Sequence, residues 1–86
     1  MAPGWDHHER RRIMDNLRDL RRSRGLAMDA LGMLAGCDAA TISRIENGKV
    51  RASNGTVVRL ATTLGVSARR MRRLCDAALP SMADAS

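Results

Sequence analysis

Residues 28–47, which read MDALGMLAGCDAATISRIEN, decide the fold of this chain. Their apolar residues recur at the i, i+3 and i+4 spacing that gathers side chains on one face of a helix. The first stripe consists of Leu31, Leu34 and Ala35, and the second of Ile42 and Ile45. The stretch therefore predicts two short amphipathic helices, over residues 28–35 and 39–47.

Small and polar residues in this stretch specify how the two helices meet. Gly36 can adopt a positive φ at low cost, which turns the chain sharply between them. Gly32 lies where the helices would approach most closely, and a larger side chain there would separate them. Asp38 can cap the second helix by accepting from a backbone N–H of the first turn. This is the layout of a DNA-binding helix-turn-helix.

Further residues match in a fixed order along most of the chain. They are Leu17-Arg18-Asp19-Leu20-Arg21, Gly25-Leu26, Leu34-Ala35-Gly36, Thr41-Ile42-Ser43-Arg44-Ile45-Glu46-Asn47-Gly48-Lys49, Leu60-Ala61 and Leu64-Gly65-Val66-Ser67. Over residues 10–79 the sequence thus resembles the Cro/cI-type (XRE) helix-turn-helix transcriptional regulator family. The resemblance implies an all-α, five-helix, lambda-repressor-like DNA-binding domain whose second and third helices form the helix-turn-helix. An unrelated small helical bundle would leave the run from Ile42 to Lys49 unexplained.

The sequence before this stretch predicts one long helix. Asp6-His7-His8-Glu9 has the spacing of a capping box, so we expect the helix to begin near His7. It should end at Arg24, with Gly25 as the left-handed cap residue. Its buried stripe should consist of Ile13, Leu17 and Leu20.

The sequence after this stretch predicts two more helices. Ser53 or Asn54 caps the fourth, and Ser67 caps a fifth that runs from Ala68 to Leu79. The apolar face of the fourth helix consists of Val57, Leu60, Ala61 and Leu64. The expected organisation is a flexible tail over residues 1–6, the DNA-binding domain over 7–79 and a flexible tail over 80–86.

Length and charge limit the class of protein. The 86 residues suit one domain, and the formal net charge of +6 points to a polyanionic partner. Charge alone does not distinguish DNA from RNA or an acidic membrane surface. No stretch has the length of a membrane span or the pattern of a signal peptide, so we expect a cytoplasmic protein with no membrane partner.

Residues with reactive or metal-binding side chains are few. Cys37 and Cys75 do not make a disulfide framework, and the adjacent His7 and His8 lack a zinc-ligand spacing. No serine or cysteine paired with histidine and no carboxylate pair suggests a catalytic site. We therefore expect no metal, no cofactor and no enzymatic activity.

The resemblance implies that the helix over residues 39–47 lies in the major groove of DNA. Its base contacts would come from Ala39, Ala40, Ser43 and Arg44. Arg44 can donate two hydrogen bonds to guanine, and a phosphate contact is the equal alternative. Relatives often have glutamine at the positions of Met28, Ala39 and Ala40, so base readout here is expected to depend more on DNA shape.

A second set of residues should bind the DNA backbone and fix the register of the protein on the duplex. Met28 would contribute only backbone N–H groups at the start of its helix. The expected phosphate contacts are Met28, Thr41, Lys49, Arg51, Ser53 and Asn54.

The resemblance also implies a partly buried salt bridge between Arg21 and Glu46 that ties the first helix to the third. Because one small module covers little DNA, we expect a homodimer on a palindromic site. The last helix has an apolar stripe surrounded by arginines, and its expected dimer contacts are Leu74, Ala78 and Leu79.

The sequence thus predicts a sequence-specific transcriptional regulator, either a repressor or an autoregulator, that binds double-stranded DNA as a dimer. The alternative is an antitoxin-type or adaptor protein whose main role is to bind a partner protein. The absence of polar side chains at Met28, Ala39 and Ala40 keeps this alternative open.

Overall fold

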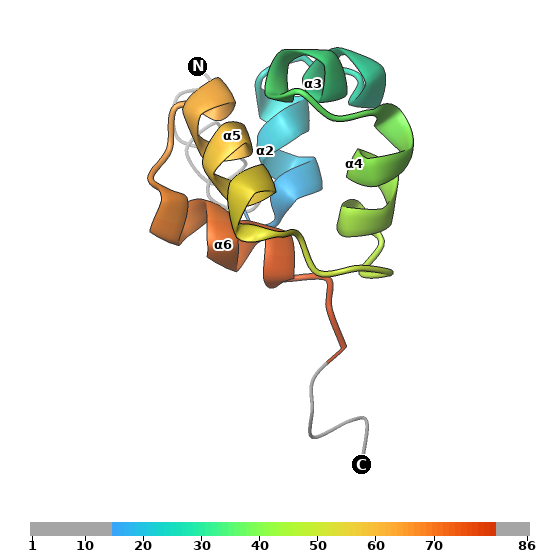
Figure 1. The fold of residues 1–86 in the computed structure, drawn as a ribbon, viewed down its shortest axis with the longest axis vertical. Coiled ribbons are helices and arrows are strands. Elements are labelled where there is room, and N and C mark those ends of the chain that lie inside the picture. Colours follow the sequence, from blue (N-terminus) through green and yellow to red (C-terminus); the bar gives the residue numbers. More distant parts are fainter. Residues whose placement is uncertain (1–14, 81–86) are drawn as a thin grey trace, which may run out of the picture.

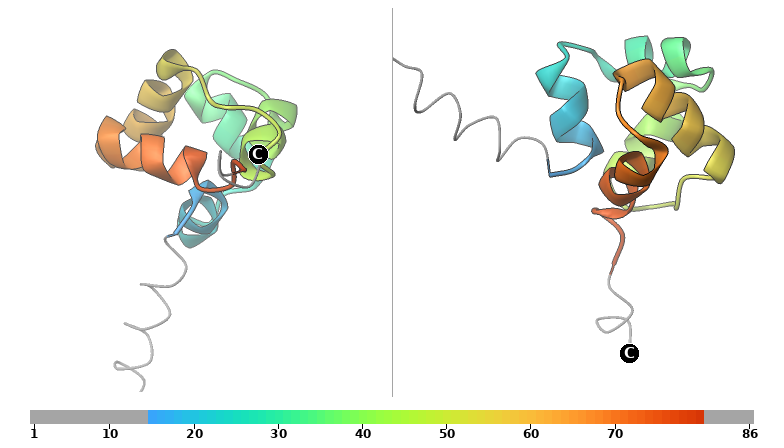
Figure 2. Two further views of the ribbon diagram at one scale, coloured as in Figure 1. Left: turned by 90° about the horizontal axis from the view of Figure 1, so that it is seen from below. Right: turned by 90° about the vertical axis from the view of Figure 1, so that its left-hand side faces the viewer.

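The computed structural model describes residues 15–80, which form five α-helices and no strand. The helices are α2 (Leu17–Ser23), α3 (Met28–Ala35), α4 (Ala39–Glu46), α5 (Asn54–Leu64) and α6 (Ala68–Asp76). α3 packs against α4 and α5 packs against α6, and α3 also contacts α5; Figure 1 shows the five helices, and in the right-hand view of Figure 2 α2 lies to one side of the other four. The all-α, five-helix fold expected from the sequence is therefore confirmed. None of the described helices is long and apolar enough to cross a bilayer.

The two helices of residues 28–47 form as the sequence predicts. α3 ends at Ala35, and the left-handed Gly36 (φ 77°) follows it. The Asp38 side chain accepts from the Thr41 N–H at 2.8 Å and caps α4, which ends at Glu46. A Cβ on Gly32 would lie 2.8 Å from the Asp38 carbonyl carbon, so glycine is required for this close approach. Local signals thus determine the geometry of the turn.

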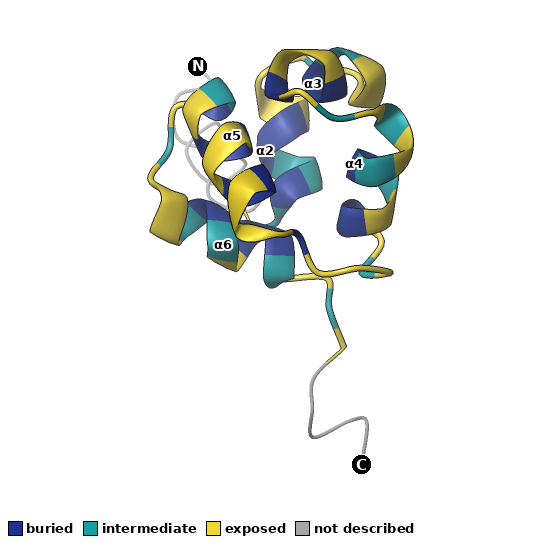
Figure 3. Cartoon of the chain, viewed as in Figure 1, coloured by how far each residue is buried: buried dark blue, intermediate teal, exposed yellow. Residues whose placement is uncertain are grey.

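One hydrophobic core lies between the five helices. In Figure 3 the buried residues of each helix face the interior, while exposed residues cover the outside. The predicted stripes of α4 and α5 are all buried, as is Leu31 of α3. The core consists of Leu17, Leu20, Leu31, Ala35, Ile42, Ile45, Ala52, Val57, Leu60, Ala61, Leu64, Met71, Leu74 and Cys75.

Leu34 is an exception to the predicted stripe of α3, because its side chain is exposed (63%). The buried face of α3 is narrower than the sequence pattern suggests, since Gly32 and Ala35 make the close contacts beside Leu31. Leu34 lies at the edge of that face, next to α5, where no helix among residues 15–80 covers it. The prediction that Leu34 is a core residue is wrong.

The first helix does not run unbroken from His7 to Arg24, as the sequence predicted. Asn16 has extended backbone angles (φ −150°, ψ 176°), and its side chain accepts from the Asp19 N–H at 2.8 Å. This is an N-cap, so α2 begins at Leu17. The signal that the sequence analysis missed is an asparagine followed three residues later by an acidic side chain, which resembles a capping box.

The end of α2 and its buried stripe agree with the prediction. Leu17 and Leu20 are buried, and Gly25 has the expected positive φ of 71°. Ile13 and the expected capping box lie outside the described residues, as do the two expected tails except for Pro80.

The last helix is shorter than predicted. Ser67 caps α6 by accepting from the Arg70 N–H, and the helix ends at Asp76 rather than at Leu79. Its buried residues include Leu74, only 6% of which is exposed. Leu74 therefore belongs to the core of a single chain.

Candidate nucleic-acid interface

The outer face of α4 carries a short polar stripe at helical spacing. Ala40, Arg44 and Asn47 are exposed and Ser43 is half-buried, whereas Ile42, Ile45 and Glu46 of the opposite face are buried in the core. The Arg44 side chain makes no hydrogen bond or ion pair with a described residue, although its charge helps to lower the pKa of Asp38, so its guanidinium is available to a ligand. Of the expected base contacts, Ala40 and Arg44 are exposed, whereas Ala39 and Ser43 are half-buried.

The exposed carboxylate of Asp38 stands at the N-terminus of α4. Hydrogen bonds from the Thr41 side chain and N–H lower the pKa of Asp38, so the group is charged at neutral pH. Its second oxygen can accept from a base amino group, such as cytosine N4. The Thr41 N–H is committed to the Asp38 cap, while the half-buried Thr41 side chain remains a candidate phosphate contact.

Arg21 and Glu46 form the salt bridge that joins α2 to the end of α4. The Arg21 Nε lies 2.6 Å from Glu46 Oε2, and its second terminal nitrogen lies 3.0 Å from Oε1. Arg21 also donates to the Leu26 carbonyl at 2.8 Å. The hydrogen bond with Glu46 raises the pKa of Arg21 despite the opposing effect of burial. This bidentate pair fixes α4 against α2.

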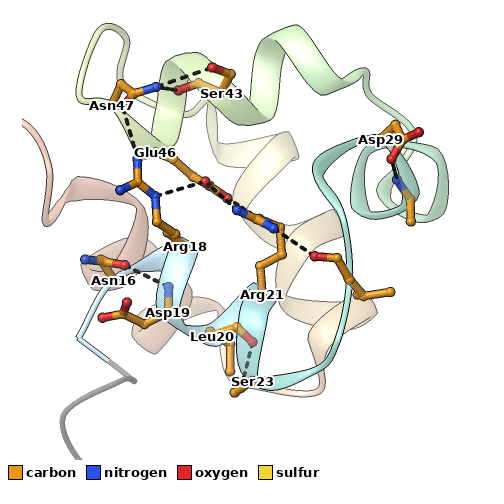
Figure 4. Close-up of polar contacts among 12 residues, drawn as sticks. Asn16, Arg18, Asp19, Leu20, Arg21, Ser23, Asp29, Ser43, Glu46 and Asn47 are labelled. Carbon is orange, nitrogen blue, oxygen red and sulfur yellow. Dashed lines mark hydrogen bonds and ion pairs between the residues drawn. The ribbon is translucent and has the colours of Figure 1, made fainter.

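Arg18 extends this network to the outer face of α4 (Figure 4). Its Nε lies 3.5 Å from Glu46 Oε1, and its terminal nitrogen donates to Asn47 Oδ1 at 3.1 Å. The Asn47 amide nitrogen donates in turn to the Ser43 carbonyl at 2.9 Å and to the Ser43 hydroxyl at 3.3 Å. Arg18 of α2 thereby orients the Asn47 side chain on the outer face of α4. The sequence did not predict this role for Arg18 and Asn47.

The loop after α4 presents two exposed basic residues, Lys49 and Arg51. The Lys49 side chain makes no hydrogen bond or ion pair with a described residue, whereas Arg51 Nε lies 3.8 Å from an Asp76 oxygen while 64% of its side chain remains exposed. Such a loose, exposed pair is easily exchanged for a phosphate. Both side chains are therefore available to a polyanion beside α4.

The remaining expected phosphate contacts differ in what they can offer. The Ser53 hydroxyl accepts from the Thr56 N–H and donates to the Thr56 hydroxyl, so it serves as the N-cap of α5. Asn54 keeps its amide N–H groups free, because only its oxygen is bonded. Met28 begins α3, where the N-cap residue Ala27 provides no side-chain bond to the backbone N–H groups. The Ala30 N–H donates to the Asp29 side chain at 2.9 Å, so the donors left for an anion at this helix end are the N–H groups of Met28 and Asp29.

The comparisons with known proteins agree with this geometry. The family described as "Helix-turn-helix domain" matches residues 15–74, which include all of α2, α3, α4 and α5. The chain belongs to this helix-turn-helix family. The match is consistent with the XRE-type regulators that the sequence resembles, and it supports DNA binding. No curated protein and no solved structure matches the chain.

Arg72 joins α6 to the loop of the helix-turn-helix domain that would meet the DNA backbone. One terminal nitrogen donates to the Ala52 carbonyl at 2.8 Å and to Asp76 at 3.2 Å, and the other donates to Asn54 Oδ1 at 2.7 Å. Arg72 therefore turns the Asn54 amide N–H groups outward. No periodic pattern could identify this role, because the partners are a backbone carbonyl and a side chain about twenty residues away.

The three expected dimer contacts do not form one exposed stripe of the helix-turn-helix domain. Leu74 is buried in the core, Leu79 is half-buried, and Ala78 is exposed beyond the end of α6. Leu74 is thus a wrong prediction for a partner contact, because a residue that packs inside one chain has little surface left for another. Ala78 and Leu79 remain candidates.

An apolar groove lies between the C-terminal end of α3 and the middle of α5. The exposed Leu34 and Val58 lie on its walls, and the neighbouring Met33 is 77% exposed. The groove encloses about 320 Å³. Its lining residues are Leu34, Ala35, Gly36, Val58, Arg59, Thr62 and Thr63.

Proposed function

We propose that this protein is a sequence-specific transcriptional regulator that binds a palindromic operator as a homodimer, with α4 in the major groove. The observation that carries the proposal is the outer face of α4, where the free guanidinium of Arg44 lies beside Ser43 and Asn47. An unpaired arginine on a rigid, capped helix suits the bidentate recognition of guanine.

The surroundings of α4 support this role. Lys49 and Arg51 lie on the loop after α4, and the N-terminal N–H groups of α3 face no side-chain acceptor of their N-cap residue. Phosphate contacts from these elements would hold the helix in register while its outer face reads the bases. The formal net charge of +6 adds a long-range attraction to DNA.

Dimerisation is the part of the proposal that depends on the physics of DNA recognition. A single module of this size buries too little surface for tight and specific binding, and a two-fold dimer doubles the contacts on a palindromic site. Ala78 and Leu79 are the proposed contacts. Both follow the end of α6, where Ala78 is exposed and Leu79 is half-buried. The regulatory outcome that we propose is repression or autoregulation.

Three arginine variants test the proposed interface in binding assays with a preferred duplex and a scrambled duplex. Arg44→Ala should reduce the preference for the specific duplex by about tenfold, because it removes a base contact. Arg51→Ala should weaken binding to both duplexes alike and lower the salt slope by about one, because it removes a phosphate contact.

Arg69→Ala is the matched control. Arg69 is an exposed arginine in the first turn of α6, near the end of α5 that is opposite to Asn54. Its loss removes one positive charge without touching the proposed interface, so both affinity and preference should stay close to wild type. If Arg44→Ala behaves like Arg69→Ala, α4 does not read DNA and the proposal is wrong.

A partner-protein role is the second candidate function, as in an antitoxin-type or adaptor protein. The apolar groove between α3 and α5 favours it, because the exposed side chains of Leu34 and Val58 line it. A stable one-to-one complex with the product of a neighbouring gene, lost in Leu34→Asp, would support this candidate. The same variant should bind DNA normally if α4 alone forms the DNA interface.

A further inference from the structure

The side chain of Asn47 is held in one orientation by partners that cannot change their hydrogen-bonding role. The Arg18 guanidinium is only a donor, so the atom facing it at 3.1 Å must be the Asn47 oxygen. The Ser43 carbonyl is only an acceptor, so the atom facing it at 2.9 Å must be the Asn47 nitrogen. Both partners require the same orientation of the amide.

This orientation determines the hydrogen bonding of the Ser43 hydroxyl. The Asn47 nitrogen also lies 3.3 Å from Ser43 Oγ, so that oxygen accepts a hydrogen bond from Asn47 and one of its two lone pairs is occupied. Thr62 and Thr63 donate their hydroxyl hydrogens to the carbonyl four residues earlier in the same helix, but Ser43 makes no such bond. The Ser43 hydroxyl hydrogen therefore has no acceptor among the described residues and is available to a ligand.

We propose that the hydrogen bond from Asn47, which Arg18 orients, favours Ser43 as a hydrogen-bond donor toward the bases, so that Ser43 prefers a base edge that presents an acceptor. A serine can ordinarily read donors or acceptors alike. In the major groove guanine and thymine present oxygen acceptors, whereas cytosine presents only an amino donor. Ser43 should therefore favour guanine or thymine over cytosine at the position it faces. This inference rests on the proposed function, since it requires α4 to enter the major groove.

Arg18 and Asn47 act as positioning residues, because neither needs to touch a base. Arg18 reaches Asn47 from α2, and the same arginine is held by Glu46, whose side chain is only 1% exposed. The buried ion-pair network therefore sets the polarity of a side chain on the reading face. A change in α2 can alter base preference without altering a DNA contact.

The test is selection of bound duplexes from a randomised DNA pool by the full-length chain, followed by sequencing. Wild type is compared with Ser43→Ala, Asn47→Ala and the phosphate-contact variant Arg51→Ala, after thermal melts show that each is folded. The position read by Ser43 is the one whose base preference changes in Ser43→Ala. Wild type should favour guanine or thymine over cytosine there by about threefold to tenfold.

Asn47→Ala should reduce this preference to less than about twofold, because a freed hydroxyl can accept from cytosine as readily as it donates. Arg51→Ala should leave the preference unchanged. Selection of cytosine by wild type would overturn the inference even if Asn47→Ala failed to fold, and so would an unchanged preference in Asn47→Ala. If no sequence is enriched by any variant, the proposed function itself fails.

Discussion

Gly48 packs directly against the backbone of Ala78. A Cβ built on Gly48 would overlap the Ala78 carbonyl oxygen, and Gly48 also has a positive φ of 70°. The contact joins the loop after α4, which carries Lys49 and Arg51, to the segment beyond the end of α6. Gly48 therefore meets two requirements for glycine, the positive φ and the close approach to Ala78. The two effects can be separated by experiment.

Gly48→Ala should lower the free energy of unfolding by about 2–3 kcal/mol, through backbone strain together with displacement of the Ala78 segment. The measurement is chemical denaturation followed by circular dichroism. Gly25→Ala is the matched control, because Gly25 has nearly the same φ of 71° and a Cβ there would meet nothing within 4 Å. Gly25→Ala should lower the free energy of unfolding by about 1 kcal/mol, which is the cost of the backbone conformation alone. Equal losses in the two variants would mean that the Ala78 contact has no energetic weight.

Gly32→Ala should destabilise the domain and abolish DNA binding, although alanine favours helices. The new methyl group would lie 2.8 Å from the Asp38 carbonyl carbon and 3.0 Å from the Cys37 oxygen, so α4 must move relative to α3. We expect a loss of about 1–3 kcal/mol in the free energy of unfolding.

Gly55→Ala is the control for this effect of helix propensity. Gly55 lies in α5, and its Cβ would meet only the flexible end of Arg59 at 3.4 Å. That variant should be about 0.5–1 kcal/mol more stable than wild type. A Gly32→Ala protein that melts above wild type would show that the close approach of the two helices is not required.

Glu46→Ala should cost about 3 kcal/mol of stability, because it leaves the Arg21 guanidinium without its carboxylate in a buried site. The Arg21 side chain is only 9% exposed and that of Glu46 only 1%. Arg18→Ala should cost less than about 1 kcal/mol, since the Arg18 side chain is 41% exposed and its longer contact is screened by water. Thermal melts of the two variants, with base preference measured on the same samples, check this ranking. A melt of Glu46→Ala that coincides with wild type would refute the structural role of the pair.

The two cysteines should differ in reactivity toward a water-soluble thiol reagent. Burial raises the pKa of Cys75 to about 11, and 1% of the residue is exposed, so neither thiolate nor access is available at neutral pH. Burial also raises the pKa of Cys37, but that residue is only half-buried. Cys37 should react in the native protein, and its rate should increase as the pH rises toward 9. Cys75 should react only when the protein unfolds. Equal native rates, compared through Cys37→Ser and Cys75→Ser, would contradict the placement of Cys75 in the core.

The helix-turn-helix could be predicted from the sequence because the residues that specify it act on their immediate neighbours. Gly36 and Asp38 determine where α3 ends and α4 begins, and both act within a few residues of themselves. The stripes of α4 and α5 were likewise confirmed as core, since a repeated apolar spacing on a short helix has one face to bury. The Asn16 cap was not predicted because Ile13, Leu17 and Leu20 share one helical spacing, which carries no sign of a break between Ile13 and Leu17.

The failures concern residues whose environment depends on contacts between helices. Leu34 and Leu74 both lie in apolar stripes, yet one is exposed and the other is buried. A stripe predicts an apolar face but not whether the same chain covers it. Arg59 and Arg72 look like solvated charges in the sequence, but both donate to backbone carbonyls of other segments. Only the packing of the helices determines these partners.

Binding to the DNA upstream of the protein's own gene, titrated with salt beside a scrambled duplex of equal length, shows whether this protein is a sequence-specific regulator. A specific regulator should show a steep salt dependence together with a preference of about a thousandfold for one sequence. Equal affinity for the two duplexes at every salt concentration, or no binding at low salt, would contradict it.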